Sequence, residues 1–297
     1  MRSQPSVGVV IPTRGTRPRQ LREAVQAVLV QDYPGELEVV VVADGGCSRW
    51  VTGTLGPAVR VLPNALSPGL PGARNTGIAA CRSDLIAFCD DDDMWLPGKL
   101  NAQVNALKEA GGEFASCGIE VEHGGRRMSR LAGTSTVTVD HLVRSRMMMV
   151  HSSTFLFERG VLWPDESAPG GQNEDWDLAL RAAKRRPLVH VDRPLVLVRW
   201  AGSHYAARWA DRIAGLEWML ARHPELAVDP CGAARVYGQL AFSHAALGQR
   251  RAAVRWAGRA FAARLAEPRA PIALAVAAGL VSASTVLSLL HSRGHGI

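Results

Sequence analysis

Apolar runs and amphipathic segments alternate through the first 110 residues. The apolar runs are short, continuous and rich in β-branched side chains, which is typical of strands buried on both faces of a sheet. They are Val7–Ile11, Leu37–Val42, Val59–Leu62 and Leu85–Cys89. The segments between them predict helices over Arg19–Gln31, over Gly72–Cys81, and from Pro97 to about Ala110, where Gly111 and Gly112 follow. Strands that alternate with helices indicate an α/β fold with a largely parallel sheet.

Beyond residue 112 the pattern changes twice. The middle of the chain predicts strands over Phe114–Val121, Ser152–Phe157, Leu188–Val191 and Leu195–Trp200, a helix over Asn173–Arg186, and loops over Gly124–Gly133 and Asp165–Gln172. The last third is rich in alanine and predicts helices over about 208–222, 233–247, 250–265 and 272–291. We therefore expect two regions, an α/β domain over residues 1–203 and a helical region over residues 204–297.

Charge separates the same two regions. Residues 1–198 carry 22 Lys and Arg against 22 Asp and Glu, whereas residues 199–297 carry 12 against 5, so the net charge of +7 lies in the last third. Arg251, Arg255 and Arg259 recur every four residues and share one helical face. A plain solvated face and docking to an acidic membrane both remain open. Nucleic acid is not expected as a partner, because the sequence contains no motif that reads nucleic acid.

The expected location is the cytoplasm. No signal peptide opens the chain, since the run Val7–Ile11 is too short for one. The five cysteines are odd in number and form no C-x-x-C pair, which favours reduced thiols. The 19 uncharged residues Ile272–Leu290 are just long enough to cross a bilayer but are rich in Ala, Gly, Ser and Thr, so they favour a buried helix. Peripheral contact with the inner face of a membrane stays open as an alternative.

The strongest chemical feature is the run of four aspartates from Asp90 to Asp93. It directly follows a predicted buried strand, where full solvation of four carboxylates is not expected. Alternate residues of an extended chain point the same way, so we expect Asp90 and Asp92 to share one face. Two carboxylates with open positions suit Mg²⁺ or Mn²⁺, whose other ligands would be water and phosphate. An acidic turn ahead of the next helix is the simpler alternative.

A second acidic pair opens the helix predicted at Asn173. Asn173 is a natural N-cap, and Glu174 and Asp175 fall in the first turn, where the helix dipole favours negative charge. Ordinary capping accounts for this pair. The Gly170-Gly171 loop ahead of it and Trp176 beside it also fit a site that faces substrate, in which Asp175 would act as the base.

Taken together, three segments resemble family-2 glycosyltransferases with the GT-A fold. They are VGVVIPT at residues 7–13, GLPGARNTGI at residues 69–78 with FCDDDDMW at residues 88–95, and NEDWDL at residues 173–178. The resemblance covers about residues 5–203. It implies an inverting enzyme that uses a divalent metal, Mn²⁺ or Mg²⁺, to move a sugar from a nucleotide-diphosphate sugar to an acceptor hydroxyl. Residues 1–203 would then bind the donor and catalyse transfer.

The resemblance also assigns roles to single positions. Pro12, Thr13 and Asp44 match positions that contact the base of the nucleotide, and Arg74 lies in the element beneath the nucleotide. Asp90 and Asp92 match the metal motif, Asp90 also lying near the ribose. The late residue Arg199 resembles an arginine near the donor phosphates. Asp175 matches the catalytic base, with Glu174 assisting it or binding the acceptor.

The sequence departs from the family pattern near the expected base-binding site. The usual acidic pair after the second strand is Ala43-Asp44, the serine that normally follows is Gly46, and Arg14-Gly15 replaces an aromatic residue and asparagine. The sequence therefore leaves the donor open among UDP, GDP and dTDP sugars, and the acceptor open among glycans, lipid-linked sugars and small molecules.

Several residues and functions keep two interpretations. His151 could bind substrate or be structural, His204 could be a third metal ligand, and Trp95 and Trp176 could stack on a sugar or pack in the core. Two other functions compete with transfer. A sugar nucleotidyltransferase would show a Gly-rich basic loop after the first strand, and a non-catalytic nucleotide-sugar-binding module would not need both acidic motifs.

Overall fold

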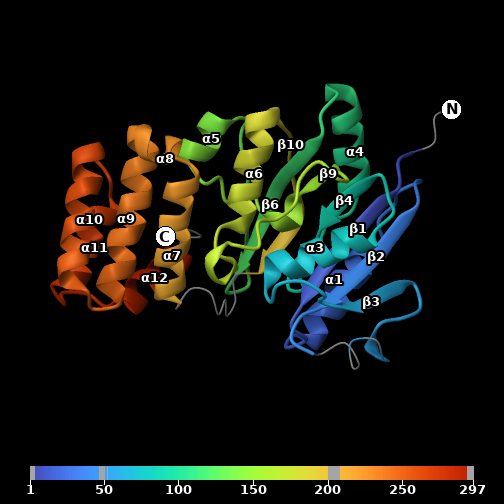
Figure 1. The fold of residues 1–297 in the computed structure, drawn as a ribbon, viewed down its shortest axis with the longest axis horizontal. Helices are drawn as coiled ribbons and strands as arrows, with labels where there is room; N and C mark the ends of the chain where they lie inside the picture. The colour runs from blue at the N-terminus through green and yellow to red at the C-terminus, as the bar shows by residue number, and fades with distance from the viewer. Residues whose placement is uncertain (1–3, 47–50, 52, 200–207, 293–297) are drawn as a thin grey trace.

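A single mixed β-sheet forms the centre of the molecule, with helices on its faces and a group of helices to one side (Figure 1). The computed structural model describes residues 4–46, 51, 53–199 and 208–292. Within these residues the main path of the sheet has the order β3-β2-β1-β4-β9-β6-β10-β5, and β7 and β8 pair with β6 and β10. The boundary expected between residues 203 and 204 lies outside the described residues.

The first half of the sheet is parallel, as the apolar runs predict. β1 (Val7–Thr13) is buried along its whole length between β2 (Leu37–Ala43) and β4 (Leu85–Phe88), and β3 (Val59–Pro63) extends the sheet beyond β2. In this register Thr13 lies opposite Ala43, so the carboxyl ends of β1 and β2 are level. The polar residues that follow these strands therefore meet at one edge.

The second half of the sheet is mixed and differs from several expectations. β9 (Leu156–Glu158) and β5 (Met94–Trp95) pair antiparallel with their neighbours, while β6 (Phe114–His123) and β10 (Leu188–Arg199) run parallel. The two strands expected over residues 188–200 are one strand with a register shift near Pro194. The strand expected over Ser152–Phe157 begins instead as the 3₁₀ turn η1 (Ser152–Thr154).

The loop expected over residues 124–133 is partly a hairpin. Gly124 and Gly125 both adopt positive φ, and this two-residue turn returns the chain as β7 (Arg126–Arg130) beside β6. The short strand β8 (Thr136–Val137) was not expected either, because two residues carry no periodic signal. Its pairing with Leu188 and Val189 of β10 defines it.

The helices of the α/β domain follow the predicted positions. They are α1 (Pro18–Leu29), α3 (Leu70–Ala80), α4 (Lys99–Ala110), α5 (Val139–Arg144), which was not expected, and α6 (Glu174–Arg185), with the 3₁₀ turn η2 (Pro169–Gly171) ahead of α6. The expected N-cap at Asn173 is wrong in its mechanism. Asn173 has φ 62° and makes no side-chain cap bond, because the chain enters α6 through a left-handed turn that already includes Gly170 and Gly171.

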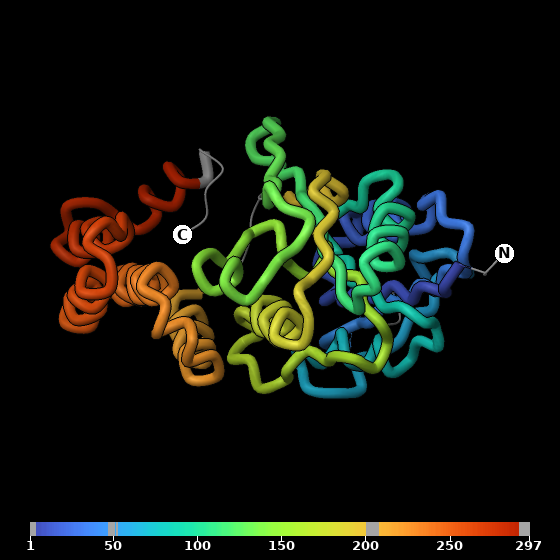
Figure 2. The backbone as a smooth tube through the Cα atoms, turned by 90° about the horizontal axis from the view of Figure 1, so that it is seen from above, coloured from blue at the N-terminus to red at the C-terminus, as the bar shows by residue number. Residues whose placement is uncertain are grey.

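The C-terminal helices stack beside the α/β domain, as the views in Figures 1 and 2 show. They are α7 (Trp209–Arg222), α8 (Glu225–Val228), α9 (Pro230–Ala246), α10 (Arg250–Ala263), α11 (Arg269–Ala277) and α12 (Ala283–Ser292). The single helix expected over residues 272–291 is instead two, since Gly279 adopts positive φ and ends α11. Among the described residues, no helix combines the length and apolar character needed to cross a membrane.

Candidate active site

The candidate site lies at the edge where β1, β2 and β4 end. The backbone N–H of Asp44 donates to the carbonyl of Thr13 at 2.8 Å, which joins the ends of β1 and β2. The Thr13 hydroxyl donates to the Asp91 carboxylate at 2.6 Å, which joins β1 to the aspartate run after β4. Three segments far apart in sequence are thus brought together by the register of the strands.

The aspartate run is a turn rather than an extension of β4. The N–H of Asp93 donates to the carbonyl of Asp90 at 3.2 Å and closes the turn. The alternation on which a shared face of Asp90 and Asp92 was expected therefore does not apply. The turn instead directs Asp90 toward Arg74 and Ser152, whereas Asp91 and Asp92 both contact Arg17.

Asp90 points toward α3 and η1. Its carboxylate accepts hydrogen bonds from Arg74 Nη2 at 2.5 Å and from the Ser152 hydroxyl at 2.9 Å, while its backbone N–H donates to the Ser153 hydroxyl at 2.9 Å. Burial raises the pKa of Asp90, but Arg74 outweighs it, so the net pKa is lowered. Asp90 is therefore held as a carboxylate.

Asp91 and Asp92 share Arg17, which stands at the start of α1. Arg17 lies 3.3 Å from Asp91 Oδ1 and also pairs with Asp92. Burial raises the pKa of Asp92 to about 6, and the charges of Asp90 and Asp91 add to this against the effect of Arg17. Asp93 is 5% exposed, and burial followed by the charges of Asp92 and Asp90 raises its pKa well above the usual range. The pKa values of the aspartates are thus shifted in opposite directions, lowered for Asp90 and raised for Asp92 and Asp93.

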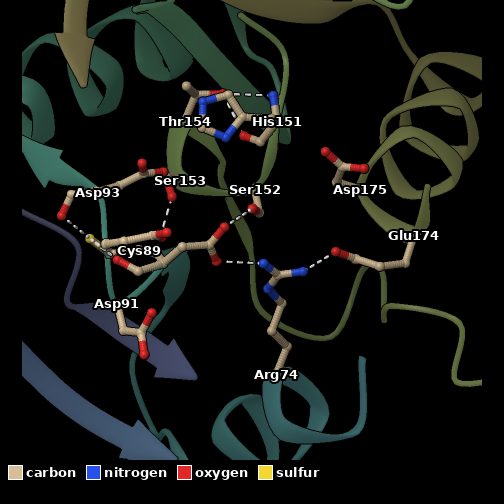
Figure 3. A network of polar contacts seen from close by, with 12 residues as sticks. Arg74, Cys89, Asp91, Asp93, His151, Ser152, Ser153, Thr154, Glu174 and Asp175 are labelled. Carbon is tan, nitrogen blue, oxygen red and sulfur yellow. Dashed lines mark hydrogen bonds and ion pairs between the residues drawn. The ribbon is translucent and has the colours of Figure 1, made fainter. Parts of the chain in front are cut away.

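Arg74 joins the aspartate run to the second acidic pair (Figure 3). Its guanidinium is 1% exposed and lies between Asp90 and Glu174, which it contacts through different nitrogens. Burial lowers the pKa of Arg74, but the two carboxylates outweigh it and the net pKa is raised. Burial raises the pKa of Glu174 to about 7 despite the pull of Arg74. The sequence placed Arg74 beneath the nucleotide but gave no indication of this double ion pair.

Asp175 has a different partner from Glu174. Both of its oxygens accept from Arg146 Nη2, at 2.8 and 3.0 Å, and the Trp176 N–H donates to the same carboxylate at 2.8 Å. Arg146 lies after α5 in a segment without periodic pattern, so no sequence signal marked it. Each carboxylate oxygen has two lone pairs, so these contacts leave Asp175 able to accept a further hydrogen bond.

His151 faces the same region as Asp90 and Asp175. Burial lowers its pKa to about 4, although both carboxylates raise it. The imidazole is therefore neutral at neutral pH. Its Nε2 atom is buried and has no hydrogen-bond partner among the described residues. Both interpretations of His151, substrate contact and structural residue, remain compatible with this position.

The other expected site residues are spread along the edge. Pro12 and Thr13 end β1, and Asp44 directly follows the end of β2 beside them. The Asp44 carboxylate accepts hydrogen bonds from Asn64 Nδ2 at 2.9 Å and from the Gly69 N–H at 3.0 Å. Arg199, at the end of β10, makes ion pairs with Glu23 at 2.7 Å and Glu122 at 3.9 Å rather than with the aspartates.

Trp95, Trp176 and His204 are the other side chains for which the sequence leaves two roles open. Trp95 and Trp176 are 2% and 1% exposed, and their indole N–H groups donate to the carbonyls of Ser153 and Leu142 at 3.1 Å. They therefore pack in the core instead of presenting a ring to a sugar. His204 lies outside the described residues.

A divalent cation fits the aspartate turn by charge and by donor type. Asp92 has a raised pKa because it is buried beside Asp90 and Asp91, and a cation would relieve that repulsion. Carboxylate oxygens are the ligands that Mg²⁺ and Mn²⁺ prefer. In the part of the chain that the structure describes, no group of three or more His, Cys, Asp and Glu side chains is arranged to hold a metal alone.

Comparison with known proteins identifies the family of the chain. The family profile described as Glycosyl transferase family 2 matches residues 8–164, more than half of the chain. The chain belongs to glycosyl transferase family 2. The matched segment contains Thr13, Arg74 and the aspartate turn, and it ends ten residues before Glu174. The chain is thus a glycosyltransferase, as the sequence predicts.

Curated and solved relatives agree with this family. The Escherichia coli UDP-Glc:α-D-GlcNAc-diphosphoundecaprenol β-1,3-glucosyltransferase WfgD is 24% identical over 181 residues, which is 60% of this chain and 70% of that protein. Staphylococcus aureus TarS 1–349 with UDP-GlcNAc has a TM-score of 0.65 at 15% identity, covering 98% of this chain and 92% of that one. The Pyrobaculum calidifontis mannosyltransferase PcManGT with GDP-Man and Mn²⁺ has a TM-score of 0.54 at 18% identity, covering 98% and 81%. At such identities the solved structures establish the GT-A fold of this glycosyltransferase.

Proposed function

We propose that this glycosyltransferase transfers a sugar, with inversion, from a nucleotide-diphosphate sugar to an acceptor hydroxyl and uses Mg²⁺ or Mn²⁺ at Asp92 and Asp90. The observation that carries the proposal is the Arg74 bridge, which sets the aspartate turn and the Glu174-Asp175 pair on opposite sides of one site. The aspartate turn would then hold the metal that binds the donor phosphates, and Asp175 would bind the acceptor hydroxyl. The solved relatives that hold UDP-GlcNAc and GDP-Man support a nucleotide-sugar donor.

In this proposal the protein groups divide the reaction. Asp175 takes the proton of the acceptor hydroxyl as its oxygen attacks the anomeric carbon, and the nucleoside diphosphate leaves from the opposite face. A metal bound at the aspartates would stabilise the negative charge on the departing phosphate oxygen. Glu174 stays fixed on Arg74 and orients the first turn of α6. Pro12, Thr13 and Asp44 would contact the base, and Arg199 would act near the donor phosphates.

The proposal extends to the acceptor and to the location of the enzyme. WfgD, by its name, acts on a diphosphoundecaprenol-linked sugar, which supports a lipid-linked acceptor among the glycan, lipid and small-molecule classes. Arg251, Arg255 and Arg259 are all exposed on α10, as the four-residue spacing predicts, and this supports peripheral contact of a cytoplasmic enzyme with an acidic membrane. A non-catalytic binding module would bind donor without turnover.

Two substitutions separate donor binding from catalysis. Thermal unfolding is followed with UDP-, GDP-, dTDP- and CMP-sugars, each with and without Mn²⁺, and release of nucleoside diphosphate is measured in parallel. A ligand at one hundred times its dissociation constant stabilises the native state by about 2.7 kcal/mol. We expect Asp92→Asn to abolish the metal-dependent shift. We expect Asp175→Asn to keep the shift and lower turnover by roughly 10²–10⁴-fold, the usual contribution of a general base.

Asp32→Asn is the matched control, because Asp32 is exposed and follows the C-terminal end of α1, whereas Arg17, which contacts the aspartates, precedes the N-terminal end. It should leave both the shift and turnover unchanged. Full turnover in Asp175→Asn would reject Asp175 as the base and leave Glu174 and His151 as candidates. Absence of any nucleotide-dependent shift in the wild-type protein would reject the donor site itself.

A further inference from the structure

A group of arginines gathers where the C-terminal helices meet the α/β domain, beside the proposed base. Its members are Arg146 after α5, Arg212 on α7, Arg235 on α9 and Arg269 at the start of α11. We call them the junction arginines. None belongs to the aspartate turn or to the segments that resemble the family. Helix α9 packs against α5, α7 and α11, which brings the four side chains to one place.

Arg235 is the centre of this group. It is 7% exposed, its guanidinium stacks over the Trp176 ring at 4.7 Å from the centroid, and its Nη2 donates to the carbonyl of Val143 at 3.2 Å. Its Nε is buried with no hydrogen-bond partner among the described residues. Trp176 follows Asp175 directly in the chain. Arg235, with its buried and unpartnered Nε, therefore contacts the residue next to the proposed base Asp175.

Arg146 and Arg269 also keep unused donors. Arg146 pairs with Asp175 and Arg269 pairs with Glu267 at 2.7 Å, yet the Nε of each is buried without a hydrogen-bond partner among the described residues. The Cβ of Arg269 lies against Gly238, and Gly238 is about one helical turn from Arg235 along α9. The side chains of Arg146 and Arg269 are 37% and 28% exposed, so solutes can reach the group from solvent.

Arg235 makes no ion pair among the described residues, although the charge of Glu267, which pairs with Arg269, also acts on it. The stretches 1–3, 47–50, 52, 200–207 and 293–297 contain no Asp or Glu. Burial lowers the pKa of Arg235 to about 9 and that of Arg212 to about 10, and the charges of Arg146 and Arg269 lower both further. Positive charge is thus concentrated here around the buried, unpartnered Nε atoms of Arg146, Arg235 and Arg269, and a bound anion would satisfy them.

We infer that the junction arginines bind a phosphate group of the acceptor, with Arg235 and Arg269 as its principal ligands and Arg146 linking that phosphate to Asp175. The inference rests on the proposed function, because it places the acceptor on the side of the site that Asp175 faces. Several guanidinium groups around one position suit a phosphate, with its charge near −2 and its several acceptor oxygens, better than a single carboxylate. Acceptor phosphate would then hold the acceptor hydroxyl at the base.

The test measures phosphate binding with the donor site already filled. The full chain is saturated with Mg²⁺ and the nucleoside diphosphate that gives the largest thermal shift. Methyl phosphate is then titrated at constant ionic strength, with acetate as the carboxylate probe. Wild type, Arg235→Gln, Arg235→Lys and Arg269→Gln are compared with Arg127→Gln, a control whose side chain is 53% exposed on β7. Nucleotide binding is recorded separately for every variant.

We expect methyl phosphate to stabilise the wild type and Arg127→Gln equally. Arg235→Gln should bind it about tenfold or more weakly, the usual effect of losing a charged hydrogen bond, and still bind nucleotide. Arg235→Lys should recover part of the affinity. Should Arg235→Gln fail to fold, Arg269→Gln, which is partly exposed, must show the loss.

Three results would overturn the inference. They are a wild type that binds nucleotide but not methyl phosphate, equal methyl phosphate binding by wild type and Arg235→Gln, and acetate binding as strong as that of methyl phosphate. A wild type that binds methyl phosphate through Arg235 but no nucleotide would retain the phosphate site and reject the proposed donor function instead.

Discussion

Arg74 shows how one residue organises the site. A buried guanidinium between two carboxylates is stable only while both partners are present, since removing one member of a buried pair leaves an uncompensated charge. Here removing Arg74 would leave both Asp90 and Glu174 without their cation. The acidic residues were predictable because aspartate runs and Glu-Asp pairs are visible in sequence. Their cations, Arg17, Arg74 and Arg146, come from three separate segments, and apart from the family resemblance at Arg74 nothing local marks them.

We predict that Arg74→Met destabilises the protein by about 3–5 kcal/mol, the range for breaking a buried pair. The methionine fills most of the same space, so the loss reports charge rather than a cavity. Arg127→Met is the control, because Arg127 is 53% exposed on β7 and pairs only at the surface. Urea denaturation of both variants measures the difference. An equal effect of the two substitutions would show that the Arg74 bridge contributes little net stability.

At the scale of elements, the close approach of α3 to β1 sets the position of Arg74. Gly77 faces Val10, and a Cβ at Gly77 would lie 2.2 Å from Val10 Cγ1. A side chain there would push the helix away from the strand. The sequence identified both elements through their apolar patterns but could not show this contact, because a glycine in a helix has the same appearance whether it touches a strand or water.

Gly77→Ala should therefore destabilise the protein by about 1–3 kcal/mol through overpacking. The same substitution at Gly258, on α10, meets no atom within 4 Å and should stabilise by roughly 0.5–1 kcal/mol, because alanine is the better helix former. Thermal unfolding of the two variants is compared with wild type. Shifts of the same sign would mean that α3 can move away from β1 without loss.

Short elements explain most of the differences between expectation and structure. β5, β8 and η1 have two or three residues each and are defined by partners elsewhere in the chain, such as Val196 for Trp95. Long periodic segments, by contrast, form as expected to within a few residues, except for the helix expected over residues 272–291, which is divided at Gly279. The carboxyl-edge site was predictable for the same reason, since it depends only on which strands are parallel and where each one ends.

For the whole molecule, Asp177 is the main polar link between the two regions. It is fully buried on α6 and accepts hydrogen bonds from Arg222 Nε at 2.5 Å and His223 Nε2 at 2.9 Å, both from the C-terminal helices, and from Arg181 at 2.8 Å on its own helix. Burial raises the pKa of Asp177, but the bonds from His223 and Arg181 outweigh it, so the net pKa is lowered.

Asp177→Asn should lower stability by about 1–3 kcal/mol, since it removes the charge that holds partly exposed arginines. A lowered folded-state pKa means that wild type keeps this contribution above the ordinary value of 3.8 and loses it as pH falls further. The difference between the two proteins should therefore be largest near neutral pH and shrink in acid. Denaturation at several pH values tests this, with the exposed Asp140→Asn as control. A difference that grows in acid would contradict it.

The aspartate turn has a consequence for how this gene can change. An in-frame deletion that removes one of the four aspartates would leave a sequence that still reads as an acidic cluster. The turn, however, gives each member its own place: Asp90 on Arg74, Asp91 on Thr13, Asp92 on Arg17 and Asp93 in the core. One codon fewer would shift every later assignment by a position and shorten the connection to β5. The run looks repetitive, yet its length is as constrained as its composition.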